Sequence, residues 1–128
     1  MSPPPGKTIR IALVDDDPAV RDALKILLET YDVSVDCYSS GMQLLNSAGR
    51  HAVDCLVLDL NLPDMSGIDV VRTLRRNGES VPAILISGGG SATTLQHAWQ
   101  AGAHTLLEKP FSDVELLQAV EEAMGSGP

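Results

Sequence analysis

The stretch Ile9-Arg-Ile-Ala-Leu-Val14-Asp-Asp-Asp-Pro18 places a short apolar run directly before three carboxylates and a proline. The run Ile9–Val14 is mostly aliphatic and β-branched, which favours a buried β-strand. From Pro18 to about Thr30, apolar residues recur at the spacing of an amphipathic helix. Asp17 is the expected N-cap of this helix, and proline suits the first helical position. The opening of the chain is therefore predicted to be a strand followed by a helix.

The same alternation continues along the chain. The further apolar runs suited to strands are Val33–Tyr38, Asp54–Leu58, Pro82–Ile86 and Thr105–Glu108. Four further helical patterns lie between and after these runs. Two of them begin with a capping box: Ser40-Gly-Met-Gln43 opens one, and Ser112-Asp-Val-Glu115 opens another that ends near Met124. The other two run from about Gly67 to Arg76 and from near Ser91 to Gly102. Strict alternation of strands and helices predicts an α/β fold, with a parallel sheet covered on both faces. Five such units are too few for an eight-stranded barrel. We therefore expect one open, doubly wound, five-stranded sheet in the flavodoxin-like strand order 2-1-3-4-5.

Length and composition fit a single domain of this kind. The chain has 128 residues, of which 44% are hydrophobic and only 3% aromatic, so the core must be largely aliphatic. We expect the domain to occupy residues 8–124. The Pro-rich residues 1–7 are expected to be a disordered tail, and residues 125–128 a linker stub or C-terminal tail. Cys37 and Cys55 are expected to be buried thiols within strands.

The charge of the chain limits its direct partners. Seventeen acidic and 9 basic residues give a net charge of −8, which would repel a polyanion, so we expect no direct nucleic-acid binding by this domain. No apolar run approaches the ~20 residues that span a bilayer, and no secretory signal pattern is visible. We therefore expect a cytoplasmic protein without membrane contact.

Polar residues follow the ends of four predicted strands. The first strand leads into Asp15 and Asp16, the third into Asp59, the fourth into Ser87 and the fifth into Lys109. In an open α/β sheet, ligands bind at the carboxyl ends of the strands, where the strand order reverses. The predicted reversal lies between the first and third strands. We therefore expect the three carboxylates to crowd one pocket, together with the hydroxyl and the ammonium group.

Crowded carboxylates need a compensating positive charge. A hard cation such as Mg²⁺ (or Mn²⁺) takes oxygen ligands and binds phosphate oxygens, and Lys109 supplies a compact positive charge. A carboxylate nucleophile, a cation site, an ammonium group and the Ser87 hydroxyl are the parts that phosphoryl transfer requires. Asp59 is thus expected to accept a phosphoryl group. The chain would then be a phosphorylation-driven switch rather than an enzyme acting on external substrates.

Several segments together resemble the receiver domain of two-component response regulators, the CheY-like superfamily. The matching segments are Val14-Asp-Asp-Asp-Pro18, Leu58-Asp-Leu-Asn-Leu-Pro-Asp-Met-Ser-Gly67, Ile86-Ser-Gly88, Ala101-Gly-Ala103 and Glu108-Lys-Pro-Phe111. The resemblance implies that Asp59 receives phosphate from a sensor histidine kinase or a histidine phosphotransfer protein. It also implies that Ser87 hydrogen bonds the phosphoryl group, that Lys109 pairs with it, and that the peptide bond before Pro110 is cis.

The resemblance also implies how a metal ion would be held. Asp16 and Asp59 would bind Mg²⁺ together with the backbone carbonyl of Asn61, and Asp15 would hold a metal-bound water. Gly89, two residues past the serine that ends the fourth strand, offers no side chain that could influence attack by water on the phosphoryl group.

The resemblance places the switch on the face formed by the fourth helix, the fifth strand and the fifth helix. That face would control an output partner or domain, and it could support a homodimer. Many receivers carry Tyr or Phe where this chain has Leu106, so the usual aromatic movement is not available in the same form. Trp99 is expected near Leu106 as part of a partner or dimer surface, with Leu95 and Ala98 facing the sheet.

Three other interpretations remain open at this point. A small aspartyl-phosphate phosphatase resembling the haloacid dehalogenases would share the nucleophile and Mg²⁺. Two residues after Asp59, however, stands Asn61, whose amide cannot shuttle a proton. A flavodoxin-like cofactor carrier would need aromatic residues around a flavin, and these are scarce. A degenerate receiver would act only as a protein-interaction module, although every expected pocket residue is present here.

Overall fold

The structure is a computed structural model that describes residues 9–89 and 92–125. It contains one parallel sheet in the order β2-β1-β3-β4-β5, which confirms the predicted order. The strands are β1 (Ile9–Val14), β2 (Val33–Tyr38), β3 (Cys55–Asp59), β4 (Ala83–Ser87) and β5 (Thr105–Glu108). The helices are α1 (Pro18–Glu29), α2 (Gly41–Leu45), the 3₁₀ helix η1 (Ala48–Ala52), α3 (Gly67–Arg76), α4 (Ala92–Ala101) and α5 (Asp113–Gly125). The tail expected at residues 1–7 lies outside the described residues, as do positions 126–128 of the expected C-terminal tail.

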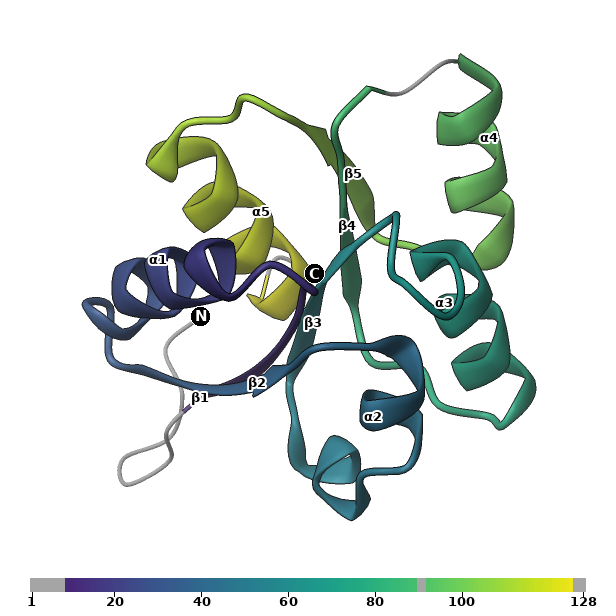
Figure 1. Ribbon diagram of the computed structural model, residues 1–128, viewed down its shortest axis with the longest axis horizontal. Helices are drawn as coiled ribbons and strands as arrows, with labels where there is room; N and C mark the ends of the chain where they lie inside the picture. Colours follow the sequence, from purple (N-terminus) through teal and green to yellow (C-terminus); the bar gives the residue numbers. More distant parts are fainter. Residues whose placement is uncertain (1–8, 90–91, 126–128) are drawn as a thin grey trace.

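Helices cover both faces of the sheet (Figure 1). Helices α1 and α5 lie on one face, and α2, α3 and α4 lie on the other. Successive side chains of β1 alternate between the two layers: Ile11 and Leu13 pack towards α1 and α5, while Ala12 and Val14 pack towards the opposite helices. The central strands β3 and β4 are buried along their whole length, which explains their continuous aliphatic character. Within the part of the chain described above, every helix is too short or too polar to cross a bilayer.

The predicted helix starts are supported by side-chain caps. The Asp17 carboxylate accepts a hydrogen bond of 2.9 Å from the Ala19 N–H at the start of α1. At the start of α5, the Ser112 hydroxyl accepts from the Glu115 N–H, and the Glu115 carboxylate accepts from the Ser112 N–H, each at 3.1 Å. This reciprocal pair is the predicted capping box.

The start of α2 differs in part from the prediction. The Ser40 hydroxyl accepts from the Gln43 N–H at 3.1 Å, but the Gln43 side chain accepts from the Ser39 N–H at 2.7 Å instead of returning to Ser40. The helix is short, and the 3₁₀ helix η1 follows it before β3 begins.

The prediction of two buried cysteines is half wrong. Cys55 on the central strand β3 is buried, and this burial raises the pKa of its thiol to about 12. Cys37 is exposed and lies near the carboxyl end of β2, an edge strand with a neighbouring strand on one side only.

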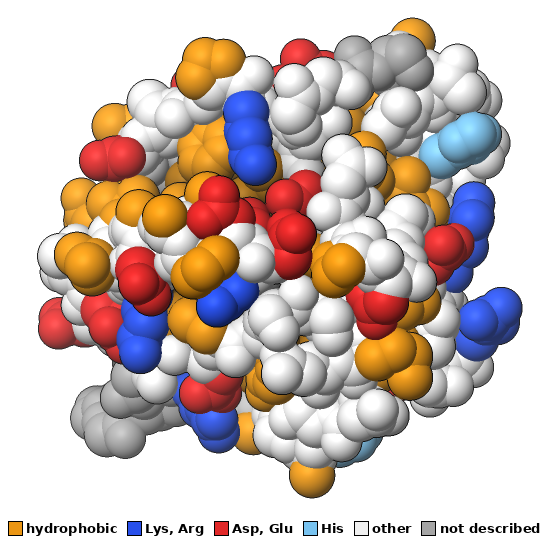
Figure 2. Space-filling view, viewed as in Figure 1, with side chains coloured by type: hydrophobic (Ala, Val, Ile, Leu, Met, Phe, Trp, Pro, Cys, Tyr) orange, Lys and Arg blue, Asp and Glu red, His pale blue; other side chains and the backbone are white. Residues whose placement is uncertain are grey.

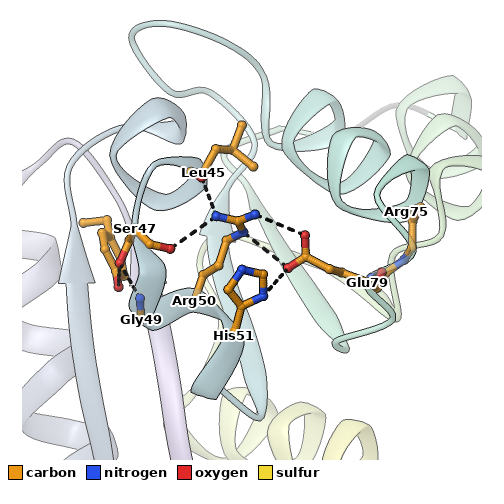
Figure 3. Close-up of polar contacts among 8 residues, drawn as sticks. Leu45, Ser47, Gly49, Arg50, His51, Arg75 and Glu79 are labelled. Carbon is orange, nitrogen blue, oxygen red and sulfur yellow. Dashed lines mark hydrogen bonds and ion pairs between the residues drawn. The ribbon is translucent and has the colours of Figure 1, made fainter.

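A cluster of polar side chains lies at the amino-terminal ends of the strands β3 and β4 (Figure 3). It stands at the edge of the sheet opposite Asp15 and Asp59. The Arg50 guanidinium in η1 donates to the Leu45 carbonyl at 2.6 Å and to the Ser47 carbonyl at 3.3 Å. It also pairs with the Glu79 carboxylate at 3.3 Å, and His51 Nδ1 lies 3.5 Å from the same carboxylate. The cluster joins η1, which precedes β3, to the segment that leads into β4. It therefore holds together the segments that enter the two central strands.

Candidate functional site

The register of the sheet brings the polar strand ends to one edge. Asp15 follows β1, which pairs with β3, and Asp59 is the last residue of β3. Ser87 ends β4, which pairs with both β3 and β5, and Lys109 follows β5. All four residues therefore stand at the carboxyl edge, around the place where the strand order reverses, as the sequence predicted.

Three carboxylates form the centre of this edge. One oxygen from each of Asp15, Asp16 and Asp59 lies within 4.8 Å of the other two. Asp15 and Asp59 are 2% and 9% exposed, whereas Asp16 is exposed to solvent. Acidic side chains gather beside a basic one near the middle of the face shown in Figure 2. A set of closely spaced carboxylate oxygens with one open side suits a hard divalent cation such as Mg²⁺.

The electrostatics of Asp15 show why positive charge is needed here. Burial raises the pKa of the Asp15 carboxyl above its usual value, and the hydrogen bond from the Asp17 N–H at 2.9 Å opposes that rise. The nearby carboxylates of Asp59 and Asp16 raise this pKa further, whereas the Lys109 ammonium lowers it. An additional cation between these carboxylates would stabilise their charged forms.

The two oxygens of Asp59 have different partners. Oδ1 accepts a hydrogen bond of 3.0 Å from the Asn61 N–H, and Oδ2 lies 3.8 Å from Lys109 Nζ. The Lys109–Pro110 peptide is cis, as expected. One oxygen is thus fixed by the loop backbone, while the other faces an ammonium group and is the better candidate for a nucleophile.

Ser87 is buried at the end of β4. Its hydroxyl accepts a hydrogen bond of 3.2 Å from the Gly89 N–H, and its carbonyl accepts one of 2.8 Å from the Lys109 N–H. Among the residues that the structure describes, a Cβ atom added at Gly88 or Gly89 would meet no other atom within 4 Å. The described part of the protein therefore leaves space beside these two glycines. Contact between Ser87 and a phosphoryl group stays a prediction.

The loop between β3 and α3 needs a glycine at its end. A Cβ on Gly67 would lie 2.6 Å from the Asp59 carbonyl oxygen and 3.2 Å from Leu60 Cα. The Gly67 N–H donates to the Leu60 carbonyl at 2.7 Å, and Asn61 forms an antiparallel bridge with Ser66. Close backbone approach at Gly67 thus keeps Asp59 and Asn61 in place.

Two residues near the site were missed by the sequence analysis. Arg21 of α1 donates to the Asp15 carbonyl at 2.7 Å. Asp64 accepts hydrogen bonds from the backbone N–H groups of Gly41 and Met42, which belong to α2. Both contacts join segments through backbone groups, and backbone groups leave no residue-type signal in the sequence.

The switch role of Trp99 and Leu106 stays a prediction, but the structure corrects one orientation that was expected on α4. Trp99 is 63% exposed, and Leu106 is partly buried against the core layer beneath α2, α3 and α4. Ala98 faces the sheet as expected, but Leu95 is 42% exposed, so its predicted inward orientation is wrong. Helix α4 buries the small residues Ala98 and Ala101, which allow it to approach the sheet closely.

Comparison with known proteins identifies relatives over almost the whole chain. The response regulator receiver domain family matches residues 11–121. The chain is 43% identical over 118 residues to the response regulator protein TodT of Pseudomonas putida, covering 92% of this chain and 52% of TodT. It is 30% identical over 119 residues to the transcriptional regulatory protein FixJ of Azorhizobium caulinodans, covering 93% of this chain and 56% of FixJ. The crystal structure of FixJ-N superposes with a TM-score of 0.83 at 32% identity, covering 95% of this chain and 98% of that one.

These similarities fit the geometry of the carboxyl edge. The matched residues 11–121 include the acidic cluster and every strand except the first residues of β1. The chain spans about half the length of TodT and FixJ. With its CheY-like α/β fold and its acidic pocket at the strand ends, the chain belongs to the family of response regulator receiver domains.

Proposed function

We propose that this receiver domain accepts a phosphoryl group on Asp59 from the phosphohistidine of a sensor histidine kinase or a histidine phosphotransfer protein. In this step a carboxylate oxygen attacks phosphorus, the P–N bond breaks, and the electron pair returns to the imidazole, which takes up a proton. The observation that carries the proposal is the environment of Asp59. Its carboxylate is grouped with two others and lies 3.8 Å from the Lys109 ammonium.

The partners of Asp59 suggest how the reaction is oriented. The Asn61 N–H holds Oδ1, which leaves Oδ2 as the attacking oxygen. The Lys109 ammonium lies on the same side as Oδ2, where it can balance the charge of the incoming phosphoryl oxygens. The Ser87 hydroxyl, which accepts a hydrogen bond from the Gly89 N–H, would donate its own proton in a hydrogen bond to one of these oxygens. The domain is thereby a phospho-acceptor that assists its own phosphorylation and dephosphorylation.

The acidic residues would hold Mg²⁺ or Mn²⁺. Asp16, Asp59 and the Asn61 backbone carbonyl are the proposed protein ligands, and Asp15 would hold a metal-bound water. The fit rests on the all-oxygen donor set and on the buried Asp15 carboxyl, whose charged form needs stabilisation. When bound, the ion neutralises charge on the carboxylates and the phosphoryl oxygens.

Phosphorylation would then alter the surface made by α4, β5 and α5. The new group adds about −1.5 to −2 charges at Asp59, which would draw Ser87 and Lys109 towards it. Helix α4 is suited to follow, because it is anchored by two alanines and leaves Trp99 exposed. The altered surface would bind an output partner or domain, or a second copy of the chain, without contacting nucleic acid itself.

A phosphorylation assay tests the proposal. The chain is incubated with acetyl phosphate and Mg²⁺, and its intact mass is measured. We expect one phosphoryl adduct on the wild type and none on Asp59→Asn. An adduct of equal yield on Asp59→Asn would contradict the assignment. Absence of any adduct under saturating donor would instead favour a receiver that acts only as an interaction module.

A further inference from the structure

The loop between β3 and α3 carries Asn61, the residue that both holds Asp59 and would offer a carbonyl to the metal. The base of this loop is closed by the hydrogen bond of 2.7 Å from the Gly67 N–H to the Leu60 carbonyl and by the bridge between Asn61 and Ser66. These contacts fix where the loop leaves and rejoins the core. The position of its outer half depends on other contacts.

The outer half of the loop is attached to α2 by Asp64. Asp64 Oδ1 accepts a hydrogen bond of 3.1 Å from the Gly41 N–H, and Oδ2 accepts one of 2.9 Å from the Met42 N–H. These donors are the first two backbone N–H groups of α2, and they belong to a segment 22 and 23 residues away in sequence. They hold the pKa of the Asp64 carboxyl below its usual value, so this side chain is an anion at neutral pH.

The neighbouring residue adds a second contact between the same segments. A Cβ atom placed on Gly41 would lie 2.6 Å from Met65 Cγ and 2.7 Å from Met65 Sδ. Met65 therefore occupies the space that a larger residue at position 41 would need. Ser40 caps the next donor of α2, the Gln43 N–H, independently of the loop. The hydrogen bonds of Asp64 and the packing of Met65 form a clasp that joins the loop to α2, and Ser40 is not part of it.

We propose that Asp64 is a positioning residue of the phosphorylation site, which acts by clasping the β3–α3 loop to α2 and so holds the Asn61 backbone in place for Mg²⁺ and for Asp59. The inference deepens the proposed function and rests on it. Asn61 is three residues from Asp64 within the same loop, and its N–H is bonded to Asp59 Oδ1. If the hydrogen bonds of Asp64 are removed, the loop is held at its base and by the packing of Leu62 and Met65 against the core. The Asn61 carbonyl is then less firmly placed, and part of the free energy of metal binding is spent on ordering it.

Metal affinity provides a direct test. Mn²⁺ binding to the full chain is measured by the enhancement of water proton relaxation, and Mg²⁺ binding by competition. We expect Asp64→Ala to raise the dissociation constant about 10-fold, the lower end of the losses caused by removing outer partners of metal ligands. The dissociation constant of Asp64→Asn should lie between those of the wild type and Asp64→Ala, because its single amide oxygen can keep one of the two N–H contacts. It also provides a milder variant if Asp64→Ala does not fold.

Hydrogen exchange reports on the clasp separately from metal binding. The Gly41 and Met42 amides are bonded to Asp64, so their exchange should accelerate in Asp64→Ala even without metal. Faster exchange with unchanged Mn²⁺ affinity would overturn the inference, because the clasp would then be structural only. Unchanged exchange would overturn it as well.

Two control variants distinguish a positioning role of Asp64 from a general effect of lost negative charge and from a loss of stability in α2. Asp69→Asn removes one negative charge from a carboxylate that pairs with Arg72 on the exposed surface of α3. Ser40→Ala weakens α2 at the Gln43 N–H without touching the loop. Both controls are expected to keep wild-type Mn²⁺ affinity, and an equal loss in either would contradict a specific role of Asp64. If the wild type bound no Mn²⁺, the proposed metal site itself would be wrong, whereas wild-type binding with an unaffected Asp64→Ala would reject the positioning role alone.

Discussion

Lys109 Nζ lies 3.8 Å from Asp59 Oδ2, while the other oxygen of Asp59 is held by the Asn61 N–H. This arrangement divides the carboxylate into a fixed oxygen and one that faces a positive charge. The Lys109 side chain is more exposed than that of Asp59, at 38% and 12%. An incoming anionic group can therefore reach Lys109 beside the largely buried Asp59.

Gly67 should be intolerant of a side chain. Gly67→Ala would place a Cβ atom 2.6 Å from the Asp59 carbonyl, so we expect a loss of about 1–3 kcal/mol in the free energy of unfolding. Urea denaturation measures this loss. Gly88→Ala is the matched control, because a Cβ there meets no atom of residues 9–89 and 92–125 within 4 Å, and its effect should stay within about 0.5 kcal/mol. Equal effects of the two substitutions would show that the close approach at Gly67 is not restrictive.

Asp15 should make metal-free stability depend on pH. Its folded pKa is raised above the usual value of 3.8, mainly by burial. Between the unfolded and folded pKa values, the folded chain binds more protons than the unfolded chain, so the Asp15 contribution to stability falls as pH rises through that window. Asp15→Asn should therefore stabilise the metal-free chain at pH 7 by roughly 0.5–2 kcal/mol, as removal of a strained functional group commonly does.

Thermal unfolding with a chelator at pH 7 and well below pH 3.8 checks this prediction. The stabilisation by Asp15→Asn should shrink at the lower pH, where the wild-type carboxyl is protonated in both states. A gain that is the same at both pH values would show that ionisation of Asp15 is not its cause.

Trp99 should report on the switch, because it is the only tryptophan and is 63% exposed on α4. If α4 responds to phosphorylation, tryptophan fluorescence should change on addition of acetyl phosphate and Mg²⁺, but not in Asp59→Asn. Trp99→Ala should alter the free energy of unfolding by no more than about 0.5 kcal/mol. A wild-type spectrum that stays constant while the mass adduct forms would contradict movement of α4 around this residue.

The polar cluster at the amino-terminal edge of the sheet should support the fold. Glu79→Gln would leave the Arg50 guanidinium, which is 19% exposed, without its carboxylate, and we expect a loss of about 1–3 kcal/mol in the free energy of unfolding. Asp69→Asn breaks an exposed pair with Arg72 and should cost less than about 1 kcal/mol. If Glu79→Gln lowered the free energy of unfolding no more than Asp69→Asn does, the cluster would contribute no more to stability than an exposed ion pair.

Much of the fold could be predicted because its signals are local. The central strands β3 and β4 are buried on both faces, so they are continuous aliphatic runs between polar segments. Parallel strands deliver their carboxyl ends to one edge, and the grouping of Asp15, Asp16 and Asp59 follows from that rule.

The remaining features depend on tertiary contacts. Leu95 was expected to face the sheet together with Ala98, yet α4 faces the sheet through alanines that permit closer approach. Cys37 is exposed near the end of the edge strand β2, and the sequence of a single strand does not show how far the helices cover it. The contact between Asp64 and α2 joins a carboxylate to backbone N–H groups distant in sequence, so the segment that contains Asp64 does not show its partner.

The most direct test of the central claim is to locate the phosphorylated residue among the crowded carboxylates. The chain is phosphorylated with acetyl phosphate and Mg²⁺, then reduced with borohydride, which converts an aspartyl phosphate to homoserine. Peptide mass mapping identifies the converted position. We predict homoserine at Asp59 and unmodified Asp15 and Asp16. Homoserine at either of those neighbours instead, or at no position under saturating donor, would contradict the assignment of Asp59 as the phospho-acceptor.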